Sequence, residues 1–296
     1  MSDILKLRAN AKVNISLDVL GVREADGYHL MDMVNRSVSL CDELTLRRTP
    51  GSDFSISSNL RYLPTGEKNL VWKAAAKLCA AVDAPLPQLS CHVLKRIPTQ
   101  AGLGGGSADA AAALIGINKL CGFGLDTEQL LPIAETVGAD VPFCLVGGCA
   151  RVQGIGEVIK PIADRTRWTM VIAMPRSGNS TKEVFALVDS AEQLQRPDSD
   201  AVQAALERGE LAAALQSAAN VFQPLVGGPQ TEQLVSAMCA QGALYAALTG
   251  TGAAVFGIFS NYKQALSCRT LLREQGYGAW VAQPTAAGVD ILPESE

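Results

Sequence analysis

Several residue types are scarce in this chain of 296 residues, and each scarcity excludes some classes of protein. Aromatic residues make up 5% of the chain, and only two histidines are present. None of the eight cysteines forms a C-x-x-C pair, so we expect no metal site and predict reduced, buried thiols. No run approaches the roughly 20 apolar residues of a membrane-spanning helix. These absences favour a globular protein whose core is filled by aliphatic residues and alanine.

Charge is also sparse, since 25 basic and 29 acidic residues leave a net charge of −4. No segment concentrates lysine and arginine enough to indicate nucleic-acid binding. The first residues, MSDILKLRANAKV, lack the apolar stretch that is typical of a secretory signal. We therefore expect a cytoplasmic protein, a monomer or a homodimer, without nucleic-acid or membrane partners.

Hydrophobic patterning predicts a mixed α/β chain without the regular alternation of a doubly wound sheet. Apolar residues alternate with polar ones over 11–21, which predicts a strand whose solvent-facing side carries Lys12 and Asn14. Ser260 is the expected N-cap of the last helix, and Asp126 or Thr127 is the expected N-cap of the helix over 126–138. We place a domain boundary after residue 161, giving domains 1–161 and 162–296. Strands are expected at 34–40, 43–48, 89–97, 147–162, 169–175, 243–250, 253–259 and 277–284, and helices at 69–82, 108–124, 126–138, much of 181–238, and 261–275.

One loop departs sharply from ordinary composition: residues 98–114 read PTQAGLGGGSADAAAAL. Glycine is costly inside regular elements, whereas alanine is the best helix former. A bare loop that enters a strong helix presents free N–H groups to an anion such as a polyphosphate. No lysine follows the glycines as in a Walker A loop, and Ser107 replaces the third glycine of a dinucleotide fingerprint. A flexible connector remains the alternative for the loop taken alone.

The loop is one of four segments that together resemble the GHMP kinases, a family that includes galactokinase, homoserine kinase and mevalonate kinase. The others are ANAKVNISLDVLGVREADGYH (9–29), GADVPF (138–143) and LTGTGAAVFGIF (248–259). This resemblance implies a two-domain α/β (α+β) fold. An N-terminal ATP-binding domain like domain 2 of ribosomal protein S5 would precede a ferredoxin-like C-terminal domain, with the active site in the cleft between them.

Within the family, the triple glycine is most similar to the kinases that act on a cytidine-diphosphate-linked methylerythritol. The resemblance implies phosphorylation of the 2-hydroxyl of this substrate by ATP with Mg²⁺, in the non-mevalonate (methylerythritol phosphate) route to isoprenoid precursors. It also implies that Asp140 is the general base and that Lys12 stabilises the charge on the transferred phosphoryl group. The competing interpretation of Asp140 is a helix cap. Because Val141 and Pro142 follow it, we expect an extended backbone there.

The same resemblance assigns the binding residues. Substrate contacts are expected from Asn14, Tyr28, His29, Thr181, Phe185, Gly250 and Gly252. ATP contacts are expected from Asn69, Leu70, Lys95, Pro98, Thr99, Gln100, Ala101, Gly102, Leu103, Gly104, Gly105, Gly106, Ser107 and Ala108. Two alternatives stay open: a kinase of this family for another small alcohol, such as homoserine or a sugar, and a nucleotide-binding module without catalysis.

Overall fold

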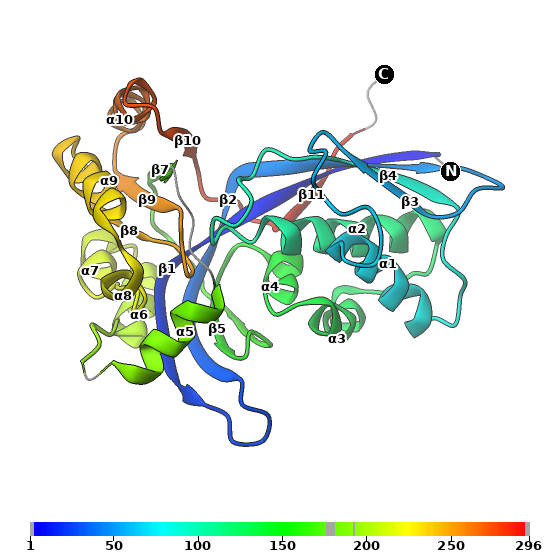
Figure 1. The fold of residues 1–296 in the computed structure, drawn as a ribbon, viewed down its shortest axis with the longest axis horizontal. Coiled ribbons are helices and arrows are strands. Elements are labelled where there is room, and N and C mark those ends of the chain that lie inside the picture. Colours follow the sequence, from blue (N-terminus) through cyan, green and yellow to red (C-terminus); the bar gives the residue numbers. More distant parts are fainter. Residues whose placement is uncertain (1–2, 176–180, 192, 294–296) are drawn as a thin grey trace.

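Two β-sheets form the frame of the molecule (Figure 1). The structure, a computed structural model, describes residues 3–175, 181–191 and 193–293, and only the backbone of 181–183. The larger sheet has the order β11–β1–β2–β4–β3, with β5 paired to β2 and β6 paired to β5. Its strands are β1 (Ile4–Val22), β2 (His29–Arg48), β3 (Ser55–Ser58), β4 (Leu89–Leu94), β5 (Cys149–Gly154), β6 (Val158–Pro161) and β11 (Val289–Ile291).

Four helices lie on one side of the larger sheet (Figure 1). They are α1 (Leu70–Ala81), α2 (Gly105–Cys121), α3 (Thr127–Val137) and α4 (Val141–Val146). The alanine-rich helix α2 packs against β1 and β2, and its residues Ala110–Leu114 are fully buried. Small side chains let the helix approach the sheet closely, so the start of α2 is held rigidly beside β1.

The smaller sheet is antiparallel and has the order β10–β7–β9–β8. Its strands are β7 (Thr169–Met174), β8 (Tyr245–Leu248), β9 (Val255–Phe259) and β10 (Gly278–Ala282). The helices of this half are α5 (Thr181–Ser190), α6 (Ser199–Arg208), α7 (Leu211–Gln216), α8 (Gln223–Val226), α9 (Pro229–Ala240) and α10 (Tyr262–Glu274). Helices α9 and α10 pack on the sheet. A strand–helix–strand–strand–helix–strand order is ferredoxin-like, which confirms the predicted fold of this half.

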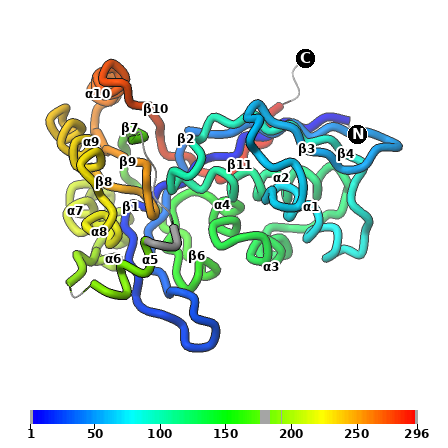
Figure 2. Tube along the Cα trace, in the orientation of Figure 1, coloured from blue at the N-terminus to red at the C-terminus, as the bar shows by residue number. Residues whose placement is uncertain are grey.

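The end of the chain returns to the larger sheet. Ser39 on β2 donates its N–H to the Gln283 carbonyl at 2.8 Å, and Thr285 donates to the Ser37 carbonyl at 3.0 Å. Strand β11 then pairs with β1, with Ile291 opposite Leu7, so the last strand lies beside the first (Figures 1 and 2). Strand β6 ends at Pro161 and β7 begins at Thr169; a boundary after residue 161 stays a prediction.

The strand predicted over 11–21 exists, but the expected solvent-facing side is wrong. Lys12 and Asn14 are 4% and 1% exposed, because two other segments cover them. The N–H of Lys12 donates to the Leu103 carbonyl at 3.0 Å, and the N–H of Asn14 donates to Thr249 Oγ1 at 3.1 Å. Alternation alone cannot tell solvent from a buried polar site.

Other predicted boundaries also shift. The runs at 34–40 and 43–48 belong to the single strand β2, and α2 begins at Gly105, three residues before the expected start. Asn261, not Ser260, caps α10: its side chain accepts a hydrogen bond from the N–H of Lys263. Of the two caps predicted for α3, Asp126 is confirmed, since it forms a capping box with Gln129.

Candidate active site

The glycine loop lines a cavity of about 560 Å³ in front of α2. Gly104 caps this helix without any side chain, so the N–H groups of the first turn face the cavity. With the helix dipole, this arrangement suits a polyphosphate. The predicted residues Asn69, Leu70, Lys95 and all ten of 98–107 line the cavity, joined by Leu63, Pro64, Lys68 and Asp109. Ala108 does not, because its side chain is buried in the helical core.

Two glycines of the loop are required by close packing. Gly102 has a φ of 73°, and a Cβ there would lie 2.2 Å from the Thr249 carbonyl oxygen. Gly104 has a φ of 68°, and a Cβ there would lie 2.9 Å from Cγ of Lys12. Left-handed backbone and contacts this short both exclude a side chain. The glycines therefore let the loop lie against Lys12 on one side and the 249–252 turn on the other.

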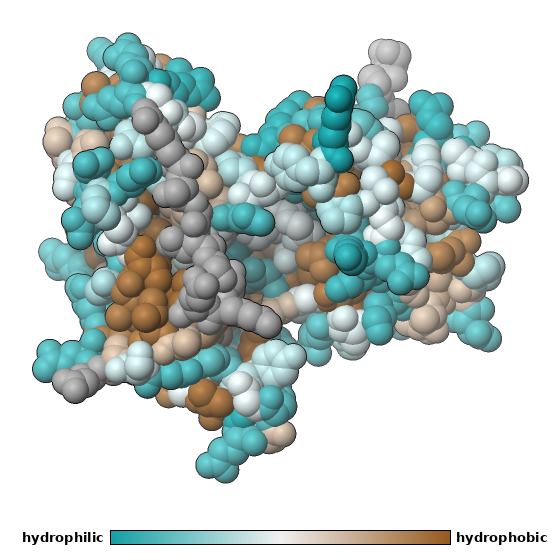
Figure 3. Space-filling model, viewed as in Figure 1, coloured by the Kyte–Doolittle hydropathy of each residue, from teal (hydrophilic) through white to brown (hydrophobic). Residues whose placement is uncertain are grey.

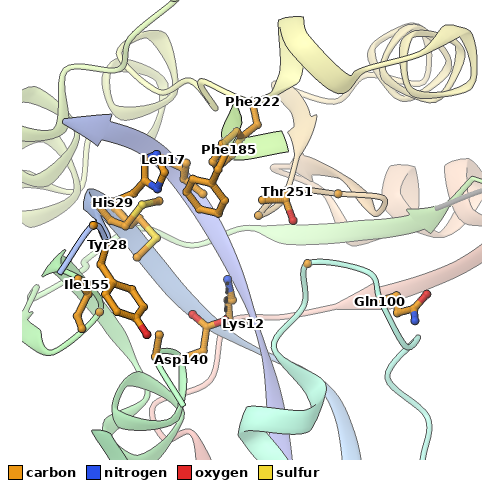
Figure 4. Close-up of a pocket in the computed structure, with 18 residues that line it drawn as sticks. Lys12, Leu17, Tyr28, His29, Gln100, Asp140, Ile155, Phe185, Phe222 and Thr251 are labelled. Carbon is orange, nitrogen blue, oxygen red and sulfur yellow. Dashed lines mark ion pairs between the residues drawn. The ribbon is translucent and has the colours of Figure 1, made fainter. Parts of the chain in front are cut away.

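A second, larger cavity of about 1020 Å³ adjoins the first, and Gln100 and Gly102 line both. Lys12 and Asp140 face each other in its wall, with Lys12 Nζ 3.6 Å from Asp140 Oδ2 (Figure 4). The Lys12 side chain is 5% exposed, and that of Asp140 is 36% exposed. A buried ammonium beside an accessible carboxylate can act on a hydroxyl group bound in this cavity.

Asp140 is held at the start of α4. Its backbone has a φ of −86° and a ψ of −11°, so the expected extended conformation is wrong. The restriction from Pro142 falls on Val141, and Pro142 fits the first helical turn, where its missing N–H costs no hydrogen bond. The Asp140 carbonyl accepts from Cys144, but the carboxylate makes no capping bond. The side chain therefore projects into the cavity.

Asn14 joins Lys12 to a turn that lies 235 residues further along the chain. Its Oδ1 accepts from Lys12 Nζ at 3.1 Å and from the Gly250 N–H at 2.8 Å, while its Nδ2 donates to Asn35 Oδ1 at 2.6 Å. The predicted residues Gly250 and Gly252 both line the large cavity. Asn14 itself is buried and lies behind Lys12, so it orients the lysine.

Aromatic side chains gather at the far end of the large cavity. Tyr28 is 60% exposed, and the His29 and Phe185 rings lie 4.6 Å apart between centroids. Figure 4 shows these three together with Phe222, on the side of the cavity away from Gln100. His29 Nε2 lies 2.8 Å from Asp189 Oδ1, which ties β2 to α5. The side chain of Thr181, also predicted here, lies outside the described residues.

Lys95 reaches the wall of the smaller cavity, but its ammonium binds two carboxylates. It pairs with Asp42 and, at 2.6 Å, with Asp109. Burial raises the pKa of Asp109 well above its usual value, although Lys95 opposes the shift. For Lys95, burial lowers the pKa, but Asp109 and Asp42 outweigh this and leave it raised. The lysine therefore stays charged.

Several cavity residues were not predicted from the sequence. Met31, Met33, Ile155, Gly156, Phe222 and Thr251 line the large cavity, and Asn220 holds the turn by donating to the Leu248 and Gly250 carbonyls. Thr251 lies between the predicted residues Gly250 and Gly252, so its position in the sequence indicated that it belongs to the site. Nothing in the sequence indicated the other residues of this set. Among the described residues, no group of three His, Cys, Asp or Glu could hold a metal ion. No helix within that part of the chain is long and apolar enough to cross a membrane.

Comparisons with known proteins identify the family and the fold. The model for the GHMP kinases N terminal domain matches residues 69–148, and that for the GHMP kinases C terminal matches residues 190–278. The crystal structure of a homoserine kinase from Cytophaga hutchinsonii ATCC 33406 superposes with a TM-score of 0.78 at 20% identity, covering 99% of this chain and 98% of that one. Both halves therefore have the GHMP kinase fold, as the sequence predicted.

Two relatives with higher sequence identity to this chain are both named as kinases of the same substrate. A 4-diphosphocytidyl-2-C-methyl-D-erythritol kinase of Alkaliphilus oremlandii (strain OhILAs) is 37% identical over 288 residues, covering 96% of this chain and 98% of the relative. The crystal structure of a 4-(cytidine 5'-diphospho)-2C-methyl-D-erythritol kinase has a TM-score of 0.78 and 30% identity, covering 94% of this chain and 98% of that one. The chain belongs to the GHMP kinase family and, within it, to the 4-diphosphocytidyl-2-C-methyl-D-erythritol kinases.

Proposed function

We propose that the protein transfers the γ-phosphoryl group of ATP to the 2-hydroxyl of 4-diphosphocytidyl-2-C-methyl-D-erythritol, in the methylerythritol phosphate pathway. The observation that carries this proposal is the pair of adjoining cavities, with Lys12 and Asp140 in the wall of the larger one. The activity named for the relatives supports the choice of substrate.

ATP occupies the smaller cavity, with its phosphates on the N–H groups of the glycine loop and the first turn of α2. The half-buried Leu70 and the cap Asn69 line the part of this cavity next to α1, which suits the adenine ring. Mg²⁺ would accompany ATP, bound mainly by the nucleotide's own phosphates, and would neutralise part of their charge.

The acceptor hydroxyl lies beside Asp140 in the larger cavity. The carboxylate accepts the hydroxyl proton, the oxygen attacks the γ-phosphorus, and ADP leaves. Lys12 donates to the phosphoryl oxygens as charge spreads over them, and Asn14 keeps its ammonium in place. Lys12 and Asp140 line the larger cavity, which adjoins the smaller one at Gln100 and Gly102, as transfer between two bound substrates requires.

The cytidine end of the acceptor is bound by Tyr28, His29 and Phe185. A pyrimidine ring stacks on the tyrosine and phenylalanine faces, and the histidine hydrogen-bonds its edge. The volume of the larger cavity, about 1020 Å³, and the aromatic side chains in its wall support a large acceptor with a base over a small alcohol such as homoserine (Figure 4).

The test is ADP release with magnesium-ATP, with 4-diphosphocytidyl-2-C-methyl-D-erythritol, homoserine, mevalonate and galactose offered separately. We expect turnover with the cytidine substrate alone. Turnover with another alcohol would support the kinase activity but contradict the proposed cytidine site. Absence of turnover with all four, despite measurable ATP binding, would favour a nucleotide-binding module.

A further inference from the structure

A third cavity, of about 460 Å³, lies where the two sheets meet and shares no lining residue with the two cavities of the active site. Its walls come from β2, from Arg96 just after β4, from α10, and from β10 with the segment that follows it. The volume falls within the roughly 300–1,000 Å³ of small-molecule sites. A ligand there would contact both halves of the protein.

The lining of this cavity is positively charged, whereas the protein as a whole is negatively charged. Arg96, Arg269 and Arg273 line it, and none of its lining residues is an aspartate or glutamate. The chain as a whole carries a net charge of −4. Arginines gathered on one concave surface of an acidic protein attract anions. The surface over α10, at the upper left of Figure 3, is mainly hydrophilic.

The arginines are only partly engaged by the protein. Arg273 donates through Nε to the Ala279 carbonyl at 2.7 Å, and Arg96 donates through Nη1 to Glu43 at 2.8 Å. Arg269 Nε is buried and has no hydrogen-bond partner among the described residues. A buried donor without a partner is costly, so a ligand that accepts from it gains affinity. Guanidinium groups bind phosphate oxygens in pairs of parallel hydrogen bonds.

Two aromatic side chains, Tyr262 and Trp280, also line the cavity, and Tyr262 is 53% exposed. Ser39 adds a hydroxyl group to the lining. We propose that this cavity binds the phosphate or diphosphate group of a small molecule, at a site separate from the active site. The anion contacts the three arginines, and an organic group, where the ligand has one, packs on the two rings.

The test uses the whole protein with both active-site cavities filled, the smaller one by magnesium and a non-hydrolysable ATP analogue and the larger one by 4-diphosphocytidyl-2-C-methyl-D-erythritol. Inorganic phosphate, inorganic pyrophosphate and phenyl phosphate are titrated separately by calorimetry. Tryptophan fluorescence in a Trp72→Phe, Trp168→Phe background, where Trp280 is the remaining tryptophan, gives a local readout. We expect saturable binding of pyrophosphate that weakens as salt is added. Tighter binding of phenyl phosphate than of phosphate would indicate an organic ester as ligand, and equal binding would indicate the free anion; both support the site.

The decisive variant is Arg269→Gln combined with Arg273→Gln, which we expect to weaken pyrophosphate binding at least tenfold. Arg208→Gln is the matched control, because Arg208 is exposed on α6 and pairs only with Glu210 among the described residues. If the double variant does not fold, Arg273→Gln alone still tests the site, since its side chain is exposed. Equal affinity in wild type, pocket variants and control would overturn the proposal. Because the active site stays filled, this result is independent of the proposed kinase function.

Discussion

Replacing Lys95 with methionine separates two roles for this residue, contact with ATP and support of the glycine loop. The Lys95 side chain is 3% exposed, and those of Asp42 and Asp109 are 0% and 5% exposed. Asp42 also accepts from the backbone N–H groups of Arg96 and Ile97, which lead into the loop. Methionine keeps the length of the side chain but removes the charge that both carboxylates need.

The expected loss in the free energy of unfolding follows from the burial of these three side chains. Removing one partner of a buried ion pair costs about 3–5 kcal/mol, because a charge is left unpaired. Burial raises the pKa of Asp109, so this group takes up a proton and limits the cost. We therefore expect a loss of about 3 kcal/mol at neutral pH. At roughly 2–4 °C per kcal/mol for a chain of this size, the melting temperature falls by ~6–12 °C.

The assay is thermal unfolding followed by circular dichroism at pH 7 and pH 5, with Lys68→Met as control. Lys68 lines the same cavity but is exposed. The raised pKa of Asp109 means that the folded state binds this proton more tightly than the unfolded state. Stability from this group is therefore gained as pH falls, and the deficit of Lys95→Met shrinks at pH 5. An unchanged melting temperature, with ATP binding weakened, would refute the structural role.

Two further predictions concern the reacting groups. Asp140→Asn should lower kcat by about 10²–10⁴ with ATP affinity nearly unchanged, since the amide cannot accept the hydroxyl proton; stopped assays and calorimetry measure both, and Asp53→Asn, on an exposed loop, is the control. Wild-type turnover in Asp140→Asn would show that another group is the base. Gly104→Ala should lower kcat at least tenfold, because its Cβ would press on Lys12 from 2.9 Å in a backbone with a φ of 68°. Gly66→Ala, where a Cβ would contact nothing within 4 Å, should leave kcat unchanged, and equal kinetics of the two variants would contradict this reasoning.

Much of the local structure could be predicted from the sequence. The alternation over 11–21, the helical spacing over 69–82 and the Asp126 cap depend on neighbours in the chain, and all three are confirmed. The glycine loop could also be predicted as an anion-binding site, since few other structures require a run of glycines directly before a strong helix. The cap of α10 was missed by one residue, because Ser260 and Asn261 have nearly equal capping preference.

The face of β1 that bears Lys12 and Asn14 could not be predicted in this way. Its burial depends on residues 249–252, which connect β8 and β9 of the other sheet and lie more than 230 positions away. Likewise, the burial of Lys95 could not be predicted, because a lysine is ordinarily a surface residue. It is buried here because the fold brings Asp42 and Asp109 to its ammonium group. The backbone of Asp140 was predicted wrongly, since the short helix α4 forms through its packing on α2 and α3.

Propensity, periodicity and motif spacing are properties of neighbouring residues, and for this reason the family, the glycine loop and most helices and strands could be predicted. The folded molecule alone shows which polar groups are buried together, how the two cavities adjoin at Gly102, and that three arginines from both halves face one cavity. Burial and electrostatic pairing depend on distances between groups that are remote in the chain. Those distances are set by the packing of the two sheets and not by any single segment.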